Sequence, residues 1–68
     1  MEFKVRFKEL RIEKGVSQEK IGKLLNMSKM AISHWEKGHS EPSIEQLKII
    51  AKFFDVSVDY LIGFSEEY

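Results

Sequence analysis

The stretch that decides the fold covers residues 17–38 and reads SQEKIGKLLNMSKMAISHWEKG. It holds two short helical patterns in succession. Ile21 and Leu25 stand four residues apart in the first, and Ile32 and Trp35 stand three apart in the second. Only two residues separate the end of the first pattern from the serine that opens the second. Two helices joined so tightly must meet at a sharp angle, which is the geometry of a helix-turn-helix.

Serine marks the start of each helix expected after the first, because its hydroxyl can cap the free N–H groups of a first turn. Ser17, Ser28 and Ser57 each follow an apolar residue and precede another one four positions later, the pattern of a hydrophobic staple. Ser43 has Gln46 three positions on, which predicts a capping box. Four helix starts can therefore be located from local chemistry alone.

These patterns predict an all-α fold with helices over residues 3–14, 18–25, 29–37, 44–54 and 58–62. We expect one domain over 1–68, with its core within about 3–63 and an acidic tail at 64–68 that frays. The inward positions expected in the fourth helix are Ile44, Leu47, Ile50, Ala51 and Phe54.

Composition excludes several classes of function. The 68 residues contain no cysteine, so a disulfide or thiolate metal site is excluded. No apolar run is long enough to span a membrane and the N-terminus has no signal-peptide pattern, which predicts a cytoplasmic protein without a membrane partner.

Catalytic and cofactor chemistry finds no support in the residues. His34 and His39 lack useful ligand spacing, so we expect no metal. Ser33 and His34 are neighbours on one helix and point apart, so they do not form a nucleophile and its base. No glycine-rich phosphate loop is present, and we expect neither a cofactor nor an enzyme.

The charges of the chain are polarised although the net charge is zero. Residues 1–40 carry nine Lys/Arg against five Asp/Glu, and residues 41–68 carry two against six. The basic part contains the two helices of residues 17–38, as a contact with an acidic polymer requires.

Four spaced motifs carry a resemblance to a known family. They read SQxxIG at 17–22, SxxxISxWExG at 28–38, PSxxxL at 42–47 and VSVDxL at 56–61. Together they resemble the Cro/phage-repressor helix-turn-helix family, also called XRE-like, from about residue 7 to residue 63. The resemblance implies a five-helix, lambda-repressor-like DNA-binding domain. Two positions depart from the family pattern: Gly22 replaces a frequent Ala, and Asn26 replaces a frequent Gly in the turn.

The resemblance implies a set of DNA contacts on residues 17–40. Lys29, Met30 and His34 match the base-reading positions of the recognition helix, and Ser33 lies beside them. A lysine there can donate to guanine, and a methionine can pack on a thymine methyl. The candidates for phosphate contacts are Gln18, Ser28, Lys23, Lys37, His39 and Ser40.

Two further roles follow from the resemblance and from the operator geometry that it implies. Arg11 and Glu36 match an ion pair between the first helix and the end of the third, a structural role. A palindromic operator calls for a two-fold homodimer, which we expect to be weak and to use Val58, Tyr60 and Phe64.

The function predicted from the sequence is a sequence-specific DNA-binding transcriptional regulator, most simply a repressor. The zero net charge leaves open a protein-interaction module of the same fold, such as an anti-repressor. An antitoxin with a protein partner is a third interpretation. Lys29 in the first turn of the third helix, with no acid before Glu36, favours the DNA-binding interpretation.

Overall fold

The computed structural model describes residues 3–68 and confirms the predicted all-α fold. The helices are α1 (Phe3–Glu13), α2 (Gln18–Leu25), α3 (Lys29–Lys37), α4 (Ile44–Phe54) and α5 (Val58–Leu61). The bounds of α2, α3 and α4 match the prediction. Helices α1 and α5 end one residue earlier, because the chain already turns ahead of Gly15 and Gly63, which have φ angles of +69° and +83°. Within residues 3–68, no helix is long and apolar enough to cross a bilayer.

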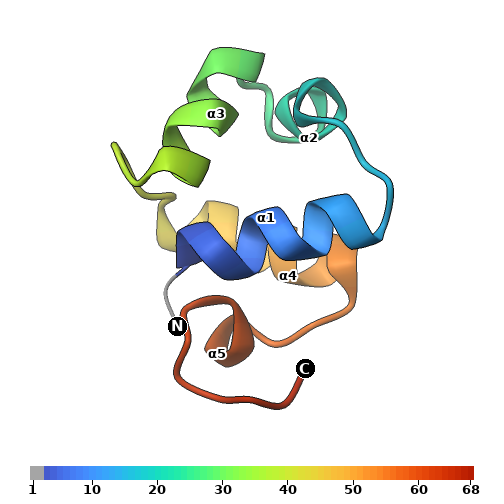
Figure 1. Cartoon of the computed structure of the whole chain (residues 1–68), viewed down its shortest axis with the longest axis vertical. Coiled ribbons are helices and arrows are strands. Elements are labelled where there is room, and N and C mark those ends of the chain that lie inside the picture. The colour runs from blue at the N-terminus through green and yellow to red at the C-terminus, as the bar shows by residue number, and fades with distance from the viewer. Residues whose placement is uncertain (1–2) are drawn as a thin grey trace.

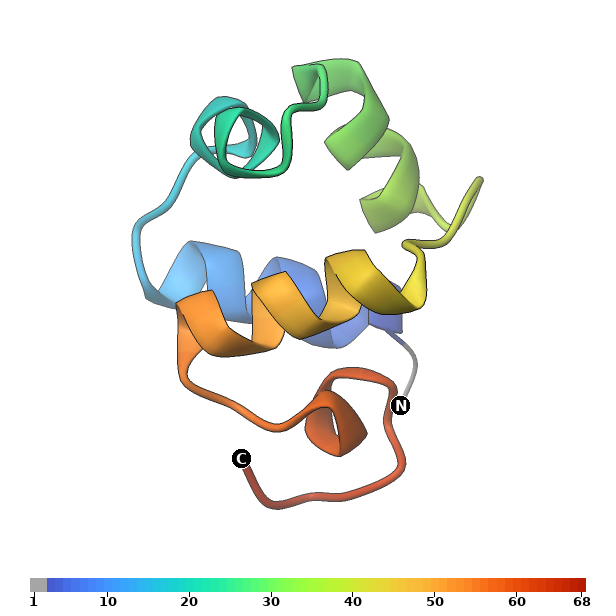
Figure 2. The same cartoon turned by 180° about the vertical axis from the view of Figure 1, so that it is seen from behind.

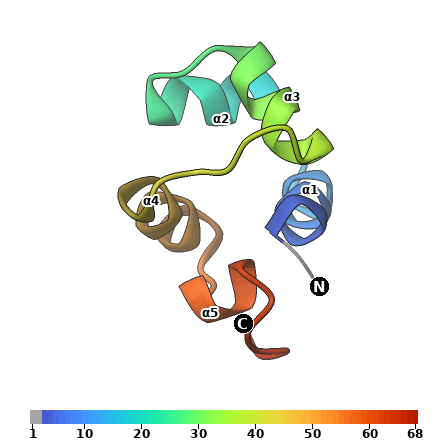
Figure 3. The same cartoon turned by 90° about the vertical axis from the view of Figure 1, so that its left-hand side faces the viewer.

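The helices are arranged around α1 and α4, which cross the middle of the molecule (Figure 1). Helices α2 and α3 lie on one side of this pair, and α5 with the C-terminal segment lies on the other, as Figure 2 shows from behind. Figure 3 shows the same order from the side. Helix α3 packs on both α1 and α2, whereas α5 packs on α1 and α4.

The predicted serine caps are all present. The hydroxyls of Ser17, Ser28, Ser43 and Ser57 accept hydrogen bonds of 3.0–3.1 Å from the backbone N–H groups of Lys20, Ala31, Gln46 and Tyr60. The side chain of Gln46 in turn accepts from the Ser43 N–H at 2.8 Å, which completes the capping box. Each cap gives a hydrogen-bond partner to a backbone N–H group that has none within the helix.

The core is built on an aromatic cluster. The Phe7 ring meets Trp35 and Phe54 edge to face, with centroids 5.9 and 6.3 Å apart, and stacks on Phe3 at 5.1 Å. Such pairs stabilise beyond the apolar area that they bury. The other buried apolar residues are Leu10, Ile21, Ile32, Ile50, Ala51 and Leu61.

The expectation that Ile44 points inward is wrong. Its side chain is 76% exposed, whereas Ile50, Ala51 and Phe54 of the same helix are buried. Ile44 is the first residue of α4, and the buried residues of this helix, Ile50, Ala51 and Phe54, all lie in its second half. The same apolar periodicity thus buries only the later turns.

Arg6 is a buried side chain that the sequence analysis did not single out. It is 2% exposed and its guanidinium donates to the backbone oxygens of Tyr60 and Ser65 at 2.9 and 2.8 Å. It also donates to Glu66 at 3.0 Å and stacks 4.1 Å from the centre of the Tyr60 ring. These contacts hold the C-terminal segment against α1.

The tail is therefore not frayed, contrary to expectation. The Ser57 N–H donates to the Tyr68 carbonyl at 3.1 Å, and the Tyr60 and Tyr68 rings lie 4.6 Å apart. The segment folds back because a buried guanidinium needs acceptors, and the backbone of the tail supplies them.

Gly22 lies where α2 approaches the turn into α3 most closely. A β-carbon placed there would lie 2.6 Å from the Met27 carbonyl oxygen. The same carbonyl belongs to a turn in which the Met27 N–H donates to the Gly22 oxygen at 2.7 Å. Glycine is required at this position in spite of its cost in helix propensity, because no room exists for a methyl group.

We predict that Gly22→Ala destabilises the fold by up to about 2 kcal/mol. The overlap with backbone, which costs ~1–3 kcal/mol in close-packed sites, outweighs the roughly 1 kcal/mol that alanine gains in helix propensity. Thermal melting measures the difference, with the exposed Glu19→Ala on the same helix as control. A variant more stable than the wild type would show that the turn relaxes freely.

Candidate nucleic-acid interface

The sharp angle between α2 and α3 is set by the turn residues. Asn26 has a left-handed conformation with φ of 58° and ψ of 44°, which asparagine tolerates better than most residues. Its N–H and that of Met27 donate to the oxygens of Lys23 and Gly22, which closes the end of α2. Ser28 then caps α3 at once. The predicted helix-turn-helix geometry is thus present in full.

One open groove brings together most of the side chains that the sequence assigned to DNA contact. It is lined by Gln18, Lys29, Met30, Ser33, His34 and Lys37. Met30 is 68% exposed, although a large apolar side chain gains free energy from burial. Two lysines and no acid line the groove, so its local charge is positive despite the neutral chain.

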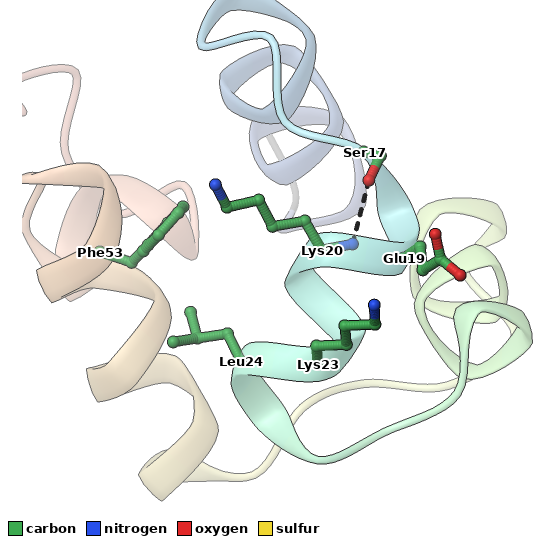
Figure 4. A pocket seen from close by; sticks show the side chains of 6 residues that line it. All are labelled: Ser17, Glu19, Lys20, Lys23, Leu24 and Phe53. Atoms are coloured by element: carbon green, nitrogen blue, oxygen red, sulfur yellow. Dashed lines mark hydrogen bonds between the residues drawn. The ribbon is translucent and has the colours of Figure 1, made fainter.

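Lys23 lies outside this groove. It lines a separate depression between α2 and α4 with Lys20, and there Leu24 of α2 and Phe53 of α4 reach into the space between the two helices (Figure 4). A phosphate contact from Lys23 would have to be made at the flank of α2. The side chain is exposed and stays a candidate by position alone.

The two candidates beyond α3 lie in the loop that follows Gly38. His39 and Ser40 are both exposed. The His39 ring lies 5.6 Å from the ring of His34. Gly38 has a φ of 80°, so the chain turns back at this point and keeps the loop next to the last turn of α3.

Arg11 and Glu36 form the ion pair that the resemblance implied. Arg11 Nε and Nη2 donate to the two oxygens of Glu36 at 2.6 and 3.1 Å, a bidentate geometry. The Glu36 side chain is 4% exposed and that of Arg11 is 14% exposed. Arg11 also donates to the Val16 oxygen at 3.0 Å, which ties the loop before α2 to the pair.

Gln18 has an unexpected partner. Its amide nitrogen donates to Glu36 at 3.1 Å, so the side chain is engaged inside the protein. A buried carboxylate attracts every donor within reach, because unsatisfied charge is costly away from water. Gln18 still lines the groove, and the network fixes where its remaining polar atoms point.

The residues assigned to a dimer contact have different environments. Phe64 is 81% exposed. Val58 packs partly buried against the core, and Tyr60 is held between Arg6 and Tyr68. Desolvation and the nearby Tyr68 raise the pKa of the Tyr60 phenol. The structure thus leaves Phe64 available and occupies the other two within the chain.

Sequence reasoning missed one residue of structural weight, the buried Arg6. The signal for Arg6 was present, since it stands on the apolar face of α1 beside Phe3, Phe7 and Leu10. A charged residue on such a face must find hydrogen-bonding or charged partners, because an unpaired charge is costly to bury. Among residues 3–68, no three His, Asp or Glu side chains converge as a metal site would need.

Comparison with known proteins decides the family. A family model described as Helix-turn-helix matches residues 7–61. The chain belongs to this helix-turn-helix family. The match includes both the turn at Asn26 and the whole of α3, so it rests on the segment whose geometry is described above.

Several relatives of this family member are regulators by name. The HTH-type transcriptional activator BcrR of Enterococcus faecalis is 42% identical over 66 residues, covering 97% of this chain and 32% of that protein. Repressor protein C2 of Salmonella phage P22 is 38% identical over 47 residues, covering 69% and 22%. The chain spans about a third or less of the length of these two relatives.

A solved structure shares the fold. The P22 c2 repressor in complex with synthetic operator 9T superposes with a TM-score of 0.85 at 31% identity, over 96% of this chain and 98% of that one. The five-helix, lambda-repressor-like architecture is therefore that of a known DNA-binding domain.

We predict that Glu36→Ala lowers the free energy of unfolding by about 3–5 kcal/mol. Removing the carboxylate leaves Arg11 without its counter-charge in a site that is mostly closed to water. Thermal and urea melts measure the loss. The exposed Glu13→Ala is the matched control and should melt like the wild type. If Glu36→Ala melts within a degree or two of the wild type, the pair is not buried in solution.

Proposed function

We propose that this chain is a sequence-specific DNA-binding transcriptional regulator that inserts α3 into the major groove. The observation that carries the proposal is the groove along α3. Its first turns present Lys29, Met30 and Ser33 to solvent, and His34 and Lys37 follow on the same face. The major-groove edge of a base pair presents hydrogen-bonding groups and, at thymine, a methyl group. A helix that exposes both donors and an apolar side chain can contact both.

In the proposed complex, base reading comes from the first half of α3. Lys29 donates to guanine, Met30 packs on a thymine methyl, and Ser33 and His34 reach base edges. Phosphate contacts come from the flanks, through Lys37, His39 and Ser40 on one side and Gln18 and Ser28 on the other. The Ser28 oxygen already accepts from Ala31 N, so its hydroxyl is left to donate. Repression, by exclusion of other proteins from the operator, is the simplest outcome of such binding.

The experiment that tests the proposal is selection from a random duplex library. The purified chain is mixed with 20-base-pair duplexes, and bound DNA is sequenced and footprinted. Enrichment of one palindromic sequence supports a regulator. A library that stays random after repeated selection would favour an interaction module of the same fold.

We predict that Lys29→Ala with His34→Ala abolishes specific binding without unfolding the protein. Both side chains are exposed, so their loss should leave helicity and melting temperature unchanged. Lys29→Ala alone should cost about 1–3 kcal/mol of binding if it contacts a guanine. Lys48→Ala, an exposed lysine on α4, is the control and should bind like the wild type. Wild-type affinity in the double variant would remove these residues from the interface.

We predict a strong salt dependence of binding despite the zero net charge. Counterion release follows the number of phosphates contacted, not the charge of the whole protein. With roughly four to six contacts per dimer, affinity should fall by about two to three orders of magnitude between 50 and 200 mM salt. Fluorescence anisotropy across this range measures the slope. A flat response would contradict a phosphate-contacting surface.

A two-fold dimer is part of the proposal, and the exposed apolar residues near α5 support its contact surface. Ile62 is 46% exposed and lines a groove with Pro42 and Leu47. Phe64 lies two residues after Ile62, and Ile44 lies two residues after Pro42. These two are the most exposed large apolar residues of 3–68. We therefore place the contact at Ile44, Ile62 and Phe64, with Val58 and Tyr60 behind it.

We predict that Phe64→Asp weakens dimerisation and operator binding while the monomer melts as before. The side chain is exposed, so a charge there costs only the contact between subunits. Sedimentation equilibrium and footprinting measure the two effects. Ile12→Asp, on another exposed apolar residue, is the control. Protection of a lone half-site, with no second contact about 34 Å away along the DNA, would rule out the dimer.

A further inference from the structure

The two histidines of the chain form a pair at the end of the recognition helix. The ring centres of His34 and His39 lie 5.6 Å apart, with the ring planes inclined by 50°. The His39 N–H donates to the His34 carbonyl at 2.9 Å, so the backbone holds the second ring beside the first. Both side chains are exposed. His34 lines the groove along α3 as well.

The charged groups around this pair are mostly cations. Lys29 and Lys37 share the groove with His34. From α1, the Lys4 side chain lies against Gly38, where a β-carbon would be 3.0 Å from Lys4 Cδ and 3.2 Å from Nζ. Two acids lie nearby. Glu41 borders the loop on the Lys4 side, and Glu36 is buried in its pair with Arg11. Helix α2 contributes only the neutral Gln18 to this groove.

Imidazole is the side chain whose charge ordinarily changes between pH 5 and 8. When protonated it carries a positive charge and donates from both nitrogens. A phosphate oxygen accepts such a charge-assisted hydrogen bond and favours the protonated ring. Two rings at the end of α3, both turned to solvent, can thus provide contacts that a neutral pair would not.

We propose that His34 and His39 form a proton-dependent contact with DNA, so that operator binding takes up protons and tightens as the pH falls from 8 to 6. The inference rests on the proposed DNA-binding function. It adds regulation by pH to that surface, because an imidazole ordinarily changes charge in this range whereas a lysine ammonium does not.

The direction follows from linkage. DNA stabilises the protonated rings, so the complex binds more protons than the free protein and affinity falls as the pH rises. Between pH 8 and 6 we expect the affinity to increase about tenfold or more. Each imidazolium that meets a phosphate should also add roughly 0.9 to the slope of log affinity against log salt at pH 6.

The composition of the chain leaves few groups other than the histidines that could cause such a pH dependence. It contains two histidines and no cysteine. The other group that ordinarily titrates in this range is the terminal amine, which remains in every variant. Glutamine is a suitable replacement for each histidine, since it keeps a hydrogen-bonding side chain and never carries charge.

The experiment uses the duplex selected from the random library as probe. Anisotropy at pH 6, 7 and 8, at constant ionic strength and with EDTA, compares the wild type with His34→Gln, His39→Gln and the double variant. Calorimetry in two buffers of different ionisation enthalpy counts the protons taken up. Lys37→Gln is the matched control, which should bind more weakly by the same factor at each pH.

We expect the pH dependence to shrink in each single variant and to vanish in the double variant. A wild type that binds the selected duplex equally at pH 6 and 8 overturns the inference and leaves DNA binding intact. A pH dependence that survives in the double variant overturns it too. Failure to select any duplex at any pH would instead overturn the proposed function.

Discussion

A single buried carboxylate, that of Glu36, joins α1 to α2 and α3, the two helices that line the groove proposed to contact DNA. Arg11 reaches it from α1 and Gln18 from α2, while Glu36 itself belongs to α3. A carboxylate withdrawn from water must be neutralised, so these helices can adopt few other arrangements. Ile32 and Trp35 of α3 are buried, so the opposite face of this helix is turned to solvent, and that face carries the groove.

Helix α1 serves as the common anchor of both ends of the molecule. Arg11 points to the α2–α3 side, and Arg6, five residues earlier, binds the segment around α5. Five residues along a helix correspond to about 140° of rotation, so the two guanidinium groups leave α1 toward different neighbours. Between them lies the aromatic cluster of Phe7, Trp35 and Phe54, which fills the interior.

Local charge decides what such a surface can bind. The chain as a whole is neutral, yet two lysines and no acid line the groove along α3. The carboxylate nearest to the groove in the helix, Glu36, is neutralised inside the protein. The acids of residues 41–68 lie mainly on α4, α5 and the tail, away from the groove along α3, so in the proposed complex they would oppose DNA binding less than the total charge suggests.

The sequence alone determined the features whose physics is local. The helix starts follow from serines that bond to backbone within three residues, and the turn follows from an asparagine that tolerates a left-handed conformation. The positions that face outward on α3 follow from a helical repeat of 3.6 residues. Most of the candidate site could therefore be predicted. Its residues Lys29, Met30, Ser33 and His34 belong to one short helix, whose outward face follows from this repeat.

Only the tertiary structure decided the features that depend on residues far apart in the chain. Arg6 is buried because the tail, some sixty residues away, offers backbone acceptors, and Ile44 is exposed although it continues the apolar pattern of α4. Gln18 turns toward Glu36, and the room at Gly22 is set by the Met27 carbonyl. A local pattern states which side chains can pack or pair, but burial is a property of the assembled neighbours, and these exist only once the helices have met.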